Sequence, residues 1–248
     1  EEVYRVIEIL ESIGVSIKWL DQNTLVVTPP KKFNLNDINV ASAIKTRSVV
    51  MLMGPLIHKL SSFSIPHPHG CNLGKRTIAA HIYALEQLGV KIKTTEKNYE
   101  ITARKLKPGD IVMYESGDTA CENVLTASAL IKGKTTVSFA SANYMVQEVC
   151  FFLEALGVKI EGIGTSTLVV HGVNEINKNI EYWNSEDPIE SMMFISAGII
   201  TDSRITITRV PIDFTALEME KLKRMNLKHK ISKTYYSFNG RTRLADIE

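Results

Sequence analysis

The sequence predicts a mixed α/β fold built from repeated βαβαββ units, and two observations support this prediction. The motifs LESIGVSI, LEQLGVKI and LEALGVKI recur about every seventy residues, each with a glycine (Gly14, Gly89, Gly157) at the same place. In every copy an amphipathic helical pattern precedes the glycine, and a β-rich stretch follows it. A weaker fourth copy, LKRMNLKHKI, has Asn226 at the glycine position. Both residue types accept the left-handed backbone that ends a helix.

The remaining elements follow from local patterns, taken in chain order. Helices are expected over 1–14, 77–89 and 119–133, with a further helix ending at Gly157. Single strands are expected at 110–115 and 134–141. Pairs of alternating strands separated by a polar or glycine-containing kink are typical of hairpins. Such pairs occupy 15–29, 90–103, 158–172 and 227–240.

Composition limits the class of protein. The chain has 248 residues, enough for one large domain or two modest ones. Its 29 basic and 27 acidic residues give a net charge of +2, which argues against a nucleic-acid arm or a membrane-surface patch. Three cysteines without metal-ligand spacing, no apolar run near 20 residues and no signal peptide favour a reducing, cytoplasmic location. Because the sequence begins within a helical pattern without Met, we expect a fragment of a longer protein.

The loop SIPHPHGCNLGKR is unlike the equivalent loops of the other repeats, and pattern-breaking loops often carry function. It places Cys71 before a helix, with Lys75 and Arg76 close behind. Positive charge and a helix N-terminus both favour the thiolate and can bind an anion. A bystander cysteine is the alternative. Cys121 and Cys150 lie within apolar helical patterns and are expected in the core.

Other candidate residues stand where helices begin. Arg47 starts an apolar segment expected to be helical to Leu60. A cation at the start of a helix opposes the helix dipole, so a bound anion would explain its position; a solvated arginine is the alternative. Ser116 and Gly117 form an exposed turn before a helix that Asp118 could cap. Asp187 and Glu190 begin another helix, where acids complement the dipole. His67 and His69 without a third ligand are weak support for a metal, and no metal is expected.

Together these segments resemble the UDP-N-acetylglucosamine enolpyruvyl transferases, the MurA type. RSVVMLMGPL is similar to that family's arginine-led helix, and PHGCNLGKRTIAAHIYALEQLGVKI is similar to its cysteine loop and following helix. ENVLTASALIKGKTTV, FLEALGVKIEGIGTSTLVVHGV and EDPIESMMFISAGII continue the match in the same order. The resemblance covers nearly the whole chain.

The resemblance implies the enolpyruvyl transferase fold, with inverted α/β barrel-like domains made of βαβαββ units. Residues 1–183 would form the cysteine-loop domain, incomplete at its N-terminus, and 184–248 the truncated first unit of a second domain. The implied reaction transfers the enolpyruvyl group of phosphoenolpyruvate to the 3′-hydroxyl of UDP-N-acetylglucosamine and releases phosphate. This is the first committed step of peptidoglycan synthesis. No cofactor, nucleic acid or membrane is implied, and a monomer is expected.

The resemblance also implies roles for individual residues. Cys71 would act as general acid toward the phosphoenolpyruvate methylene, and Arg76 would contact substrate phosphate. Arg47 would line the nucleotide-sugar site, and Lys75 adds charge to the cysteine loop. The segment that would wrap the uridine nucleotide consists of Arg76, Thr77, Ile78, Ala79 and Ala80. Ser116 and Gly117 would lie near the second contact with the nucleotide. Asp187 and Glu190 would be the acids at the domain junction.

Two departures from the family pattern keep alternatives open. Ala79 stands where the family has aspartate, which leaves room for a different nucleotide sugar. The family's N-terminal Lys-Asn pair and later aspartate and arginine would lie outside residues 1–248, so this polypeptide alone is expected to be inactive. The alternatives are a diverged, non-catalytic UDP-sugar binder, an enolpyruvylshikimate-phosphate synthase-like enzyme, against which Cys71 counts, and a scaffold that only binds partners.

Overall fold

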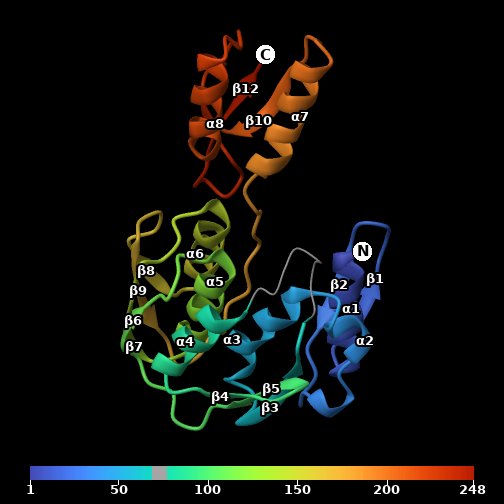
Figure 1. Ribbon diagram of the computed structural model, residues 1–248, viewed down its shortest axis with the longest axis vertical. Coiled ribbons are helices and arrows are strands. Elements are labelled where there is room, and N and C mark those ends of the chain that lie inside the picture. Colours follow the sequence, from blue (N-terminus) through green and yellow to red (C-terminus); the bar gives the residue numbers. More distant parts are fainter. Residues whose placement is uncertain (69–76) are drawn as a thin grey trace.

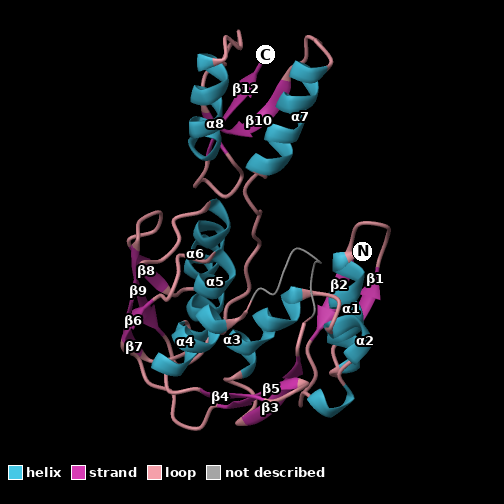
Figure 2. Ribbon diagram, viewed as in Figure 1, coloured by secondary structure: helices cyan, strands magenta, loops and turns pink. Residues whose placement is uncertain are grey.

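Helices fill the inside of the larger part of the molecule, and three β-sheets lie around them (Figures 1 and 2). The computed structural model describes residues 1–68 and 77–248. A smaller C-terminal unit with its own three-stranded sheet is joined to the larger part by the extended segment 173–187 (Figure 1). This arrangement fits the predicted repeats, because each repeat supplies a small sheet and helices that need a common core.

Residues 1–102 hold one hairpin and one three-stranded sheet. The elements are, in chain order, α1 (Glu2–Ser12), β1 (Ser16–Trp19), β2 (Leu25–Thr28), the 3-10 helix η1 (Leu35–Asp37), α2 (Val40–Ala43), the 3-10 helix η2 (Arg47–Leu52), α3 (Met53–Leu56), β3 (Ser62–Pro66), α4 (Ala79–Gln87), β4 (Lys91–Thr94) and β5 (Asn98–Thr102). β1 pairs with β2, and β5 lies between β3 and β4; all these pairs are antiparallel. The two predicted hairpins are therefore confirmed.

The segment that begins at Arg47 differs from the single helix expected through Leu60. It starts as the 3-10 helix η2, continues as α3 and ends at Leu56. Pro55 explains the break between η2 and α3, because proline has no backbone N–H to donate to the carbonyl of Met51, four residues earlier.

Residues 110–172 form one complete βαβαββ unit. Its elements are β6 (Asp110–Val112), α5 (Asp118–Ser128), β7 (Gly133–Ser138), α6 (Tyr144–Ala155), β8 (Lys159–Glu161) and β9 (Thr167–Gly172). β6 and β7 are parallel, joined by α5, and β9 lies antiparallel between β7 and β8. The strands and helix predicted for this region are confirmed.

The C-terminal unit repeats the pattern from its first helix onward, without a leading strand among residues 173–187. It contains α7 (Pro188–Ile200), β10 (Ile207–Pro211), α8 (Ile212–Arg224), β11 (Tyr235–Tyr236) and β12 (Arg243–Ile247). The prediction of a hairpin within 227–240 is wrong: β11 pairs with β12, and Ile231 bridges to Ile247. The tight turn falls at Asn239–Gly240, where Gly240 has φ +71°. An Asn-Gly pair favours that backbone, whereas the expected kink has no such pair.

The four repeat positions end their helices as predicted. Gly14, Gly89 and Gly157 have φ of 99°, 91° and 101°, and Asn226 has φ 70°. All four therefore occupy the left-handed region that stops a helix without steric cost to glycine.

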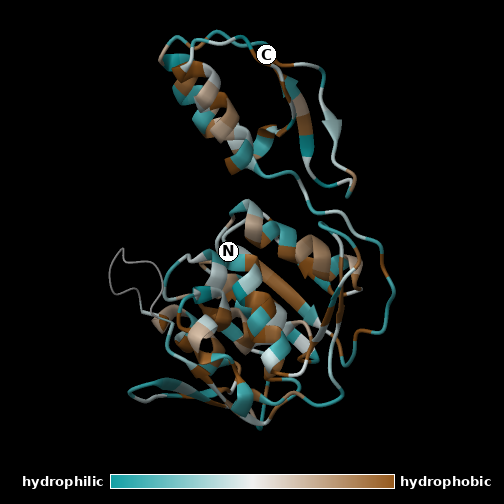
Figure 3. Cartoon of the chain, turned by 90° about the vertical axis from the view of Figure 1, so that its right-hand side faces the viewer, coloured by the Kyte–Doolittle hydropathy of each residue, from teal (hydrophilic) through white to brown (hydrophobic). Residues whose placement is uncertain are grey.

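The described residues form two separate hydrophobic clusters. The larger one contains buried residues from Ile9 to Val170, and the smaller one consists of Ile195, Val210, Met219 and Ile247. Figure 3 shows hydrophobic residues on the helices enclosed by the outer sheets. Within the described residues, no helix combines the length and apolar character needed to cross a bilayer.

Candidate functional site

Arg47 lies beside the segment that leads into α4. Thr46 caps η2 by accepting a hydrogen bond from Ser48 N at 3.2 Å, so Arg47 occupies the first turn. The Arg47 Nη2 atom donates to the Thr77 carbonyl oxygen at 3.4 Å. The hydroxyls of Thr46 and Ser48 both donate to Glu2, which lowers the pKa of that carboxyl group and ties η2 to α1. Two predicted substrate contacts, Arg47 and Thr77, are thus adjacent.

The first turns of α4 and α5 lie side by side. Thr119, in the first turn of α5, has its Oγ1 3.3 Å from Nε2 of His81, in the first turn of α4. Ala79 is exposed, whereas Ile78 and Ala80 are buried. Among the described residues no side chain caps either helix, whereas α6 and α7 are capped by Asn143 and Asp187. First-turn N–H groups without caps can bind an anion.

Ser116 and Gly117 precede α5 as predicted. Ser116 is exposed and Gly117 is the N-cap residue, with an extended backbone. The expectation that Asp118 caps this helix is wrong. Its carboxylate instead accepts hydrogen bonds from Ser141 Oγ and Asn143 Nδ2 at the start of α6. Asp118 therefore anchors α5 to the start of α6, and no side chain of the described residues caps the N-terminus of α5.

A buried network joins these segments below the surface. The side chain of Asn123 is fully buried in α5. Its Oδ1 accepts from Gly54 N at 2.7 Å, and its Nδ2 donates to Val50 O at 2.9 Å and to His81 Nδ1 at 3.1 Å. Burial, with a smaller contribution from the charge of Arg47, lowers the pKa of His81 to about 4. His81 is therefore neutral near pH 7.

The sequence patterns did not single out His81 or Asn123. One signal was present, because Asn123 is a polar residue among apolar neighbours in ENVLTAS. A polar side chain inside a core helix needs hydrogen-bond partners, so such a residue marks a point where several backbones meet.

The cysteine loop itself lies outside the described residues. Cys71, Lys75 and Arg76 therefore stay predictions. Cys121 and Cys150 are fully buried, as predicted for core residues. Burial raises the pKa of the Cys121 thiol and raises that of Cys150 to about 12. Neither is a nucleophile at neutral pH.

Asp187 and Glu190 lie apart from Arg47 and Thr77, on α7. Asp187 caps the helix by accepting from Ile189 N at 2.7 Å, and the Tyr144 hydroxyl donates to its Oδ1 at 3.4 Å. Both acids line a pocket of about 530 Å³. Tyr144 belongs to α6, so this contact connects Asp187 to the larger part of the molecule.

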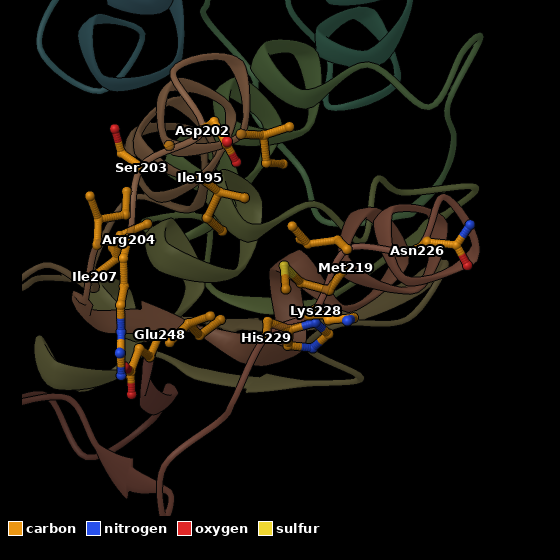
Figure 4. A pocket seen from close by; sticks show the side chains of 15 residues that line it. Ile195, Asp202, Ser203, Arg204, Ile207, Met219, Asn226, Lys228, His229 and Glu248 are labelled. Carbon is orange, nitrogen blue, oxygen red and sulfur yellow. The ribbon is translucent and has the colours of Figure 1, made fainter.

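A second pocket, of about 480 Å³, lies in the C-terminal unit between α7, α8 and the sheet (Figure 4). Ile195, Ile207 and Met219 face it, and Arg204 pairs with Glu248 at its rim (Figure 4). None of the predicted site residues that the structure describes lines it. Over residues 1–68 and 77–248 there is no group of three or more His, Cys, Asp or Glu side chains able to hold a metal ion.

Sequence comparisons identify relatives. A model of the EPSP synthase (3-phosphoshikimate 1-carboxyvinyltransferase) family matches residues 1–244. The UDP-N-acetylglucosamine 1-carboxyvinyltransferase of Bradyrhizobium diazoefficiens is 33% identical over 207 residues, 84% of this chain and 47% of that protein. The protein of the same name from Campylobacter hominis is 32% identical over 231 residues, 91% of this chain and 54% of that protein. The chain thus spans about half the length of the curated relatives it matches.

Solved structures support the fold. The enolpyruvyl transferase NikO from Streptomyces tendae matches with a TM-score of 0.76 at 19% identity, covering 99% of this chain and 56% of that chain. EPSP synthase from Acinetobacter baumannii matches with a TM-score of 0.66 at 20% identity, covering 98% and 55%. At these identities the likeness concerns the fold alone. It confirms the predicted enolpyruvyl transferase fold, and together with the family match it shows that the chain belongs to the EPSP synthase family of enolpyruvyl transferases.

Proposed function

We propose that this chain is the cysteine-loop half of an enzyme that transfers the enolpyruvyl group of phosphoenolpyruvate to the 3′-hydroxyl of UDP-N-acetylglucosamine. The observation that supports this most is the convergence of three segments. Arg47 contacts the carbonyl of Thr77, and the first turn of α4 contacts that of α5 next to Ser116 and Gly117. The curated relatives at 32–33% identity are named for this reaction.

The chemistry of these segments suits an anionic substrate. Arg47 supplies a guanidinium group, and the first turns of α4 and α5 offer N–H groups without side-chain caps among the described residues. Guanidinium and helix N-termini both stabilise phosphate oxygens. A nucleoside diphosphate sugar presents such oxygens, so this is where its diphosphate would bind.

Cys71 and Arg76 would perform the transfer itself. Addition of a hydroxyl to the enol carbon develops positive charge there while a proton is added to the methylene carbon. Cys71 would donate that proton, and the proton of the attacking hydroxyl would pass to the family's aspartate, which would lie outside residues 1–248. Loss of a proton from the resulting methyl group, together with departure of the phosphate held by Arg76 and Lys75, would then restore the carbon–carbon double bond. The proton donor and the phosphate-binding cations would act together. A cation placed near the phosphate stabilises the negative charge that develops on the phosphate as it departs.

We also propose that residues 1–183 and 184–248 belong to two domains of a cytoplasmic enzyme of peptidoglycan synthesis, active as a monomer. The two separate hydrophobic clusters support the boundary. Asp187 and Glu190 would lie at the junction, where Asp187 accepts a hydrogen bond from Tyr144. The remainder of the second domain would come from chain outside residues 1–248.

Ala79 is the residue that favours the alternative functions. It is exposed at the start of α4, where the resemblance places an aspartate next to the nucleotide. A UDP-sugar binder without catalysis, or an enzyme with another acceptor, would tolerate this loss.

Phosphate release separates these functions. The intact protein should release phosphate from phosphoenolpyruvate only when UDP-N-acetylglucosamine is present, and Cys71→Ser should abolish release while the nucleotide sugar still binds. Binding without release in the unaltered protein would favour the non-catalytic binder. Release with shikimate 3-phosphate, and none with UDP-N-acetylglucosamine, would overturn the proposed acceptor.

A further inference from the structure

The orientation of the Asn123 amide is fixed by its backbone partners. A backbone N–H can only donate, so the atom that faces Gly54 N at 2.7 Å must be the oxygen. A carbonyl can only accept, so the atom that faces Val50 O at 2.9 Å must be the NH₂ group. The same NH₂ group is 3.1 Å from His81 Nδ1. The amide therefore has one possible orientation.

This orientation determines the state of His81. Because the Asn123 NH₂ donates, Nδ1 of His81 must accept and carries no proton. A neutral imidazole then carries its proton on Nε2, which donates to Thr119 Oγ1 at 3.3 Å. Thr119 is exposed at the beginning of α5, so the network runs from the core to the surface of the candidate site.

We propose that Asn123 is a positioning residue, which fixes His81 in its Nε2-protonated form and thereby holds the three substrate-contact segments in one arrangement. Gly54 and Val50 belong to the segment that starts at Arg47, His81 to α4 and Thr119 to α5. One side chain thus joins every described segment of the candidate nucleotide site. The identity of the ligand rests on the proposed function, whereas the hydrogen-bond network does not.

Nuclear magnetic resonance of ¹⁵N-labelled histidine rings tests the network directly. Asn123→Asp keeps the shape of the side chain but replaces the NH₂ donor with an acceptor. We expect His81 to gain a proton on Nδ1, with its ring signals leaving the pattern of the Nε2-protonated neutral form. Ser128→Ala is the matched control on α5, because the Ser128 hydroxyl is buried and has no hydrogen-bond partner within the described residues. Unchanged ring signals in Asn123→Asp would overturn the proposal.

Binding of UDP-N-acetylglucosamine, measured by calorimetry, tests the consequence. If the whole free energy of one lost hydrogen bond to a buried group is expressed in ligand binding, the binding constant falls about tenfold. We expect Asn123→Asp to raise the dissociation constant about tenfold and Ser128→Ala to leave it unchanged. A shift of the ring signals without weaker binding would reduce Asn123 to a purely structural residue and overturn the positioning role.

A second pair of variants at position 81 keeps the test decisive if Asn123→Asp does not fold. The side-chain oxygen of asparagine can take the place of Nδ1, so His81→Asn retains an acceptor for Asn123, whereas His81→Leu retains none. We expect the asparagine variant to bind within about threefold of the unaltered protein and the leucine variant at least about tenfold more weakly. Equal binding by both would overturn the proposal. If the unaltered protein binds no UDP-sugar, the proposed function fails, while the ring signals still decide the role of Asn123.

Discussion

Arg241 and Glu154 form an ion pair between the two parts of the chain, with Nη2 3.0 Å from Oε2. The Arg241 Cζ atom also lies 5.4 Å from the centroid of the Phe151 ring, one helical turn away on α6. Tyr182, in the connecting segment, donates to Glu148 of the same helix at 2.7 Å. The face of α6 is thus the surface against which the C-terminal unit is held.

Removing this contact should loosen the C-terminal unit without unfolding either cluster. Half of the Arg241 side chain is exposed, so the ion pair and the cation–π contact together contribute about 1 kcal/mol. We expect Arg241→Ala to increase proteolytic cleavage within 173–187, with little change in the melting temperature. Arg224→Ala, which changes an exposed arginine on α8, is the control. Equal cleavage of the two variants would show that Arg241 does not hold the unit.

Arg47 should contribute more to ligand binding than to stability. Hydrogen bonds from a charged group contribute about 1.5–3 kcal/mol, so Arg47→Ala should weaken UDP-N-acetylglucosamine binding at least about tenfold. Arg47→Lys should recover only part of this, because lysine keeps the charge but not the planar fork. Arg104→Ala, at an exposed position after β5, should leave affinity unchanged. Calorimetric titration measures all three, and undiminished binding by Arg47→Ala would exclude Arg47 from the site.

His81 should make stability depend on pH in the mildly acidic range. Its pKa is about 4 in the folded protein and 6.5 when unperturbed. Between these values the unfolded chain binds a proton at His81 and the folded chain does not. The free energy of unfolding therefore falls as pH decreases from 6.5 toward 4, by up to about 1.4 kcal/mol per pH unit.

Urea unfolding at several pH values measures this slope. The His81→Asn variant cannot titrate at this position, so its unfolding free energy should fall less steeply over the same range. Other groups, including His58, whose pKa is also lowered by burial, contribute equally to both proteins. Parallel pH profiles for the two proteins would contradict the prediction.

Thiol labelling should distinguish the loop cysteine from the core cysteines. Cys121 and Cys150 are fully buried with raised pKa values, so a Cys71→Ser protein should resist alkylation at pH 8 until it is unfolded. The unaltered protein should be labelled at Cys71 alone, as peptide mass mapping would show. Labelling of Cys150 in the folded Cys71→Ser protein would mean that α6 opens readily.

Local signals predicted the fold better than they predicted the site. The repeated glycines predicted the helix ends correctly, because few residues other than glycine adopt the left-handed backbone that ends a helix, as the φ of 99° at Gly14 shows. The prediction of a hairpin within 227–240 is wrong because the tight turn lies at Gly240, after β11 rather than before it. β11 therefore pairs with β12, the strand that follows the turn. His81 and Asn123 are 42 positions apart, and nothing local to either residue indicates the other. Contacts of this kind arise only from the packing of α4 against α5.

Two equivalent glycines offer a final test, because their surroundings differ. Both Gly89 and Gly157 have left-handed backbone, which costs alanine about 1–2 kcal/mol. A Cβ at Gly89 would lie 2.5 Å from the Lys105 carbonyl oxygen, whereas a Cβ at Gly157 would meet nothing within 4 Å. Gly157→Ala should therefore lower the free energy of unfolding by only the backbone term. Gly89→Ala should lower it by at least about 1 kcal/mol more, since the connection to β6 must shift. Urea unfolding of the two variants measures the difference, and equal losses would mean that the chain at Lys105 moves aside freely.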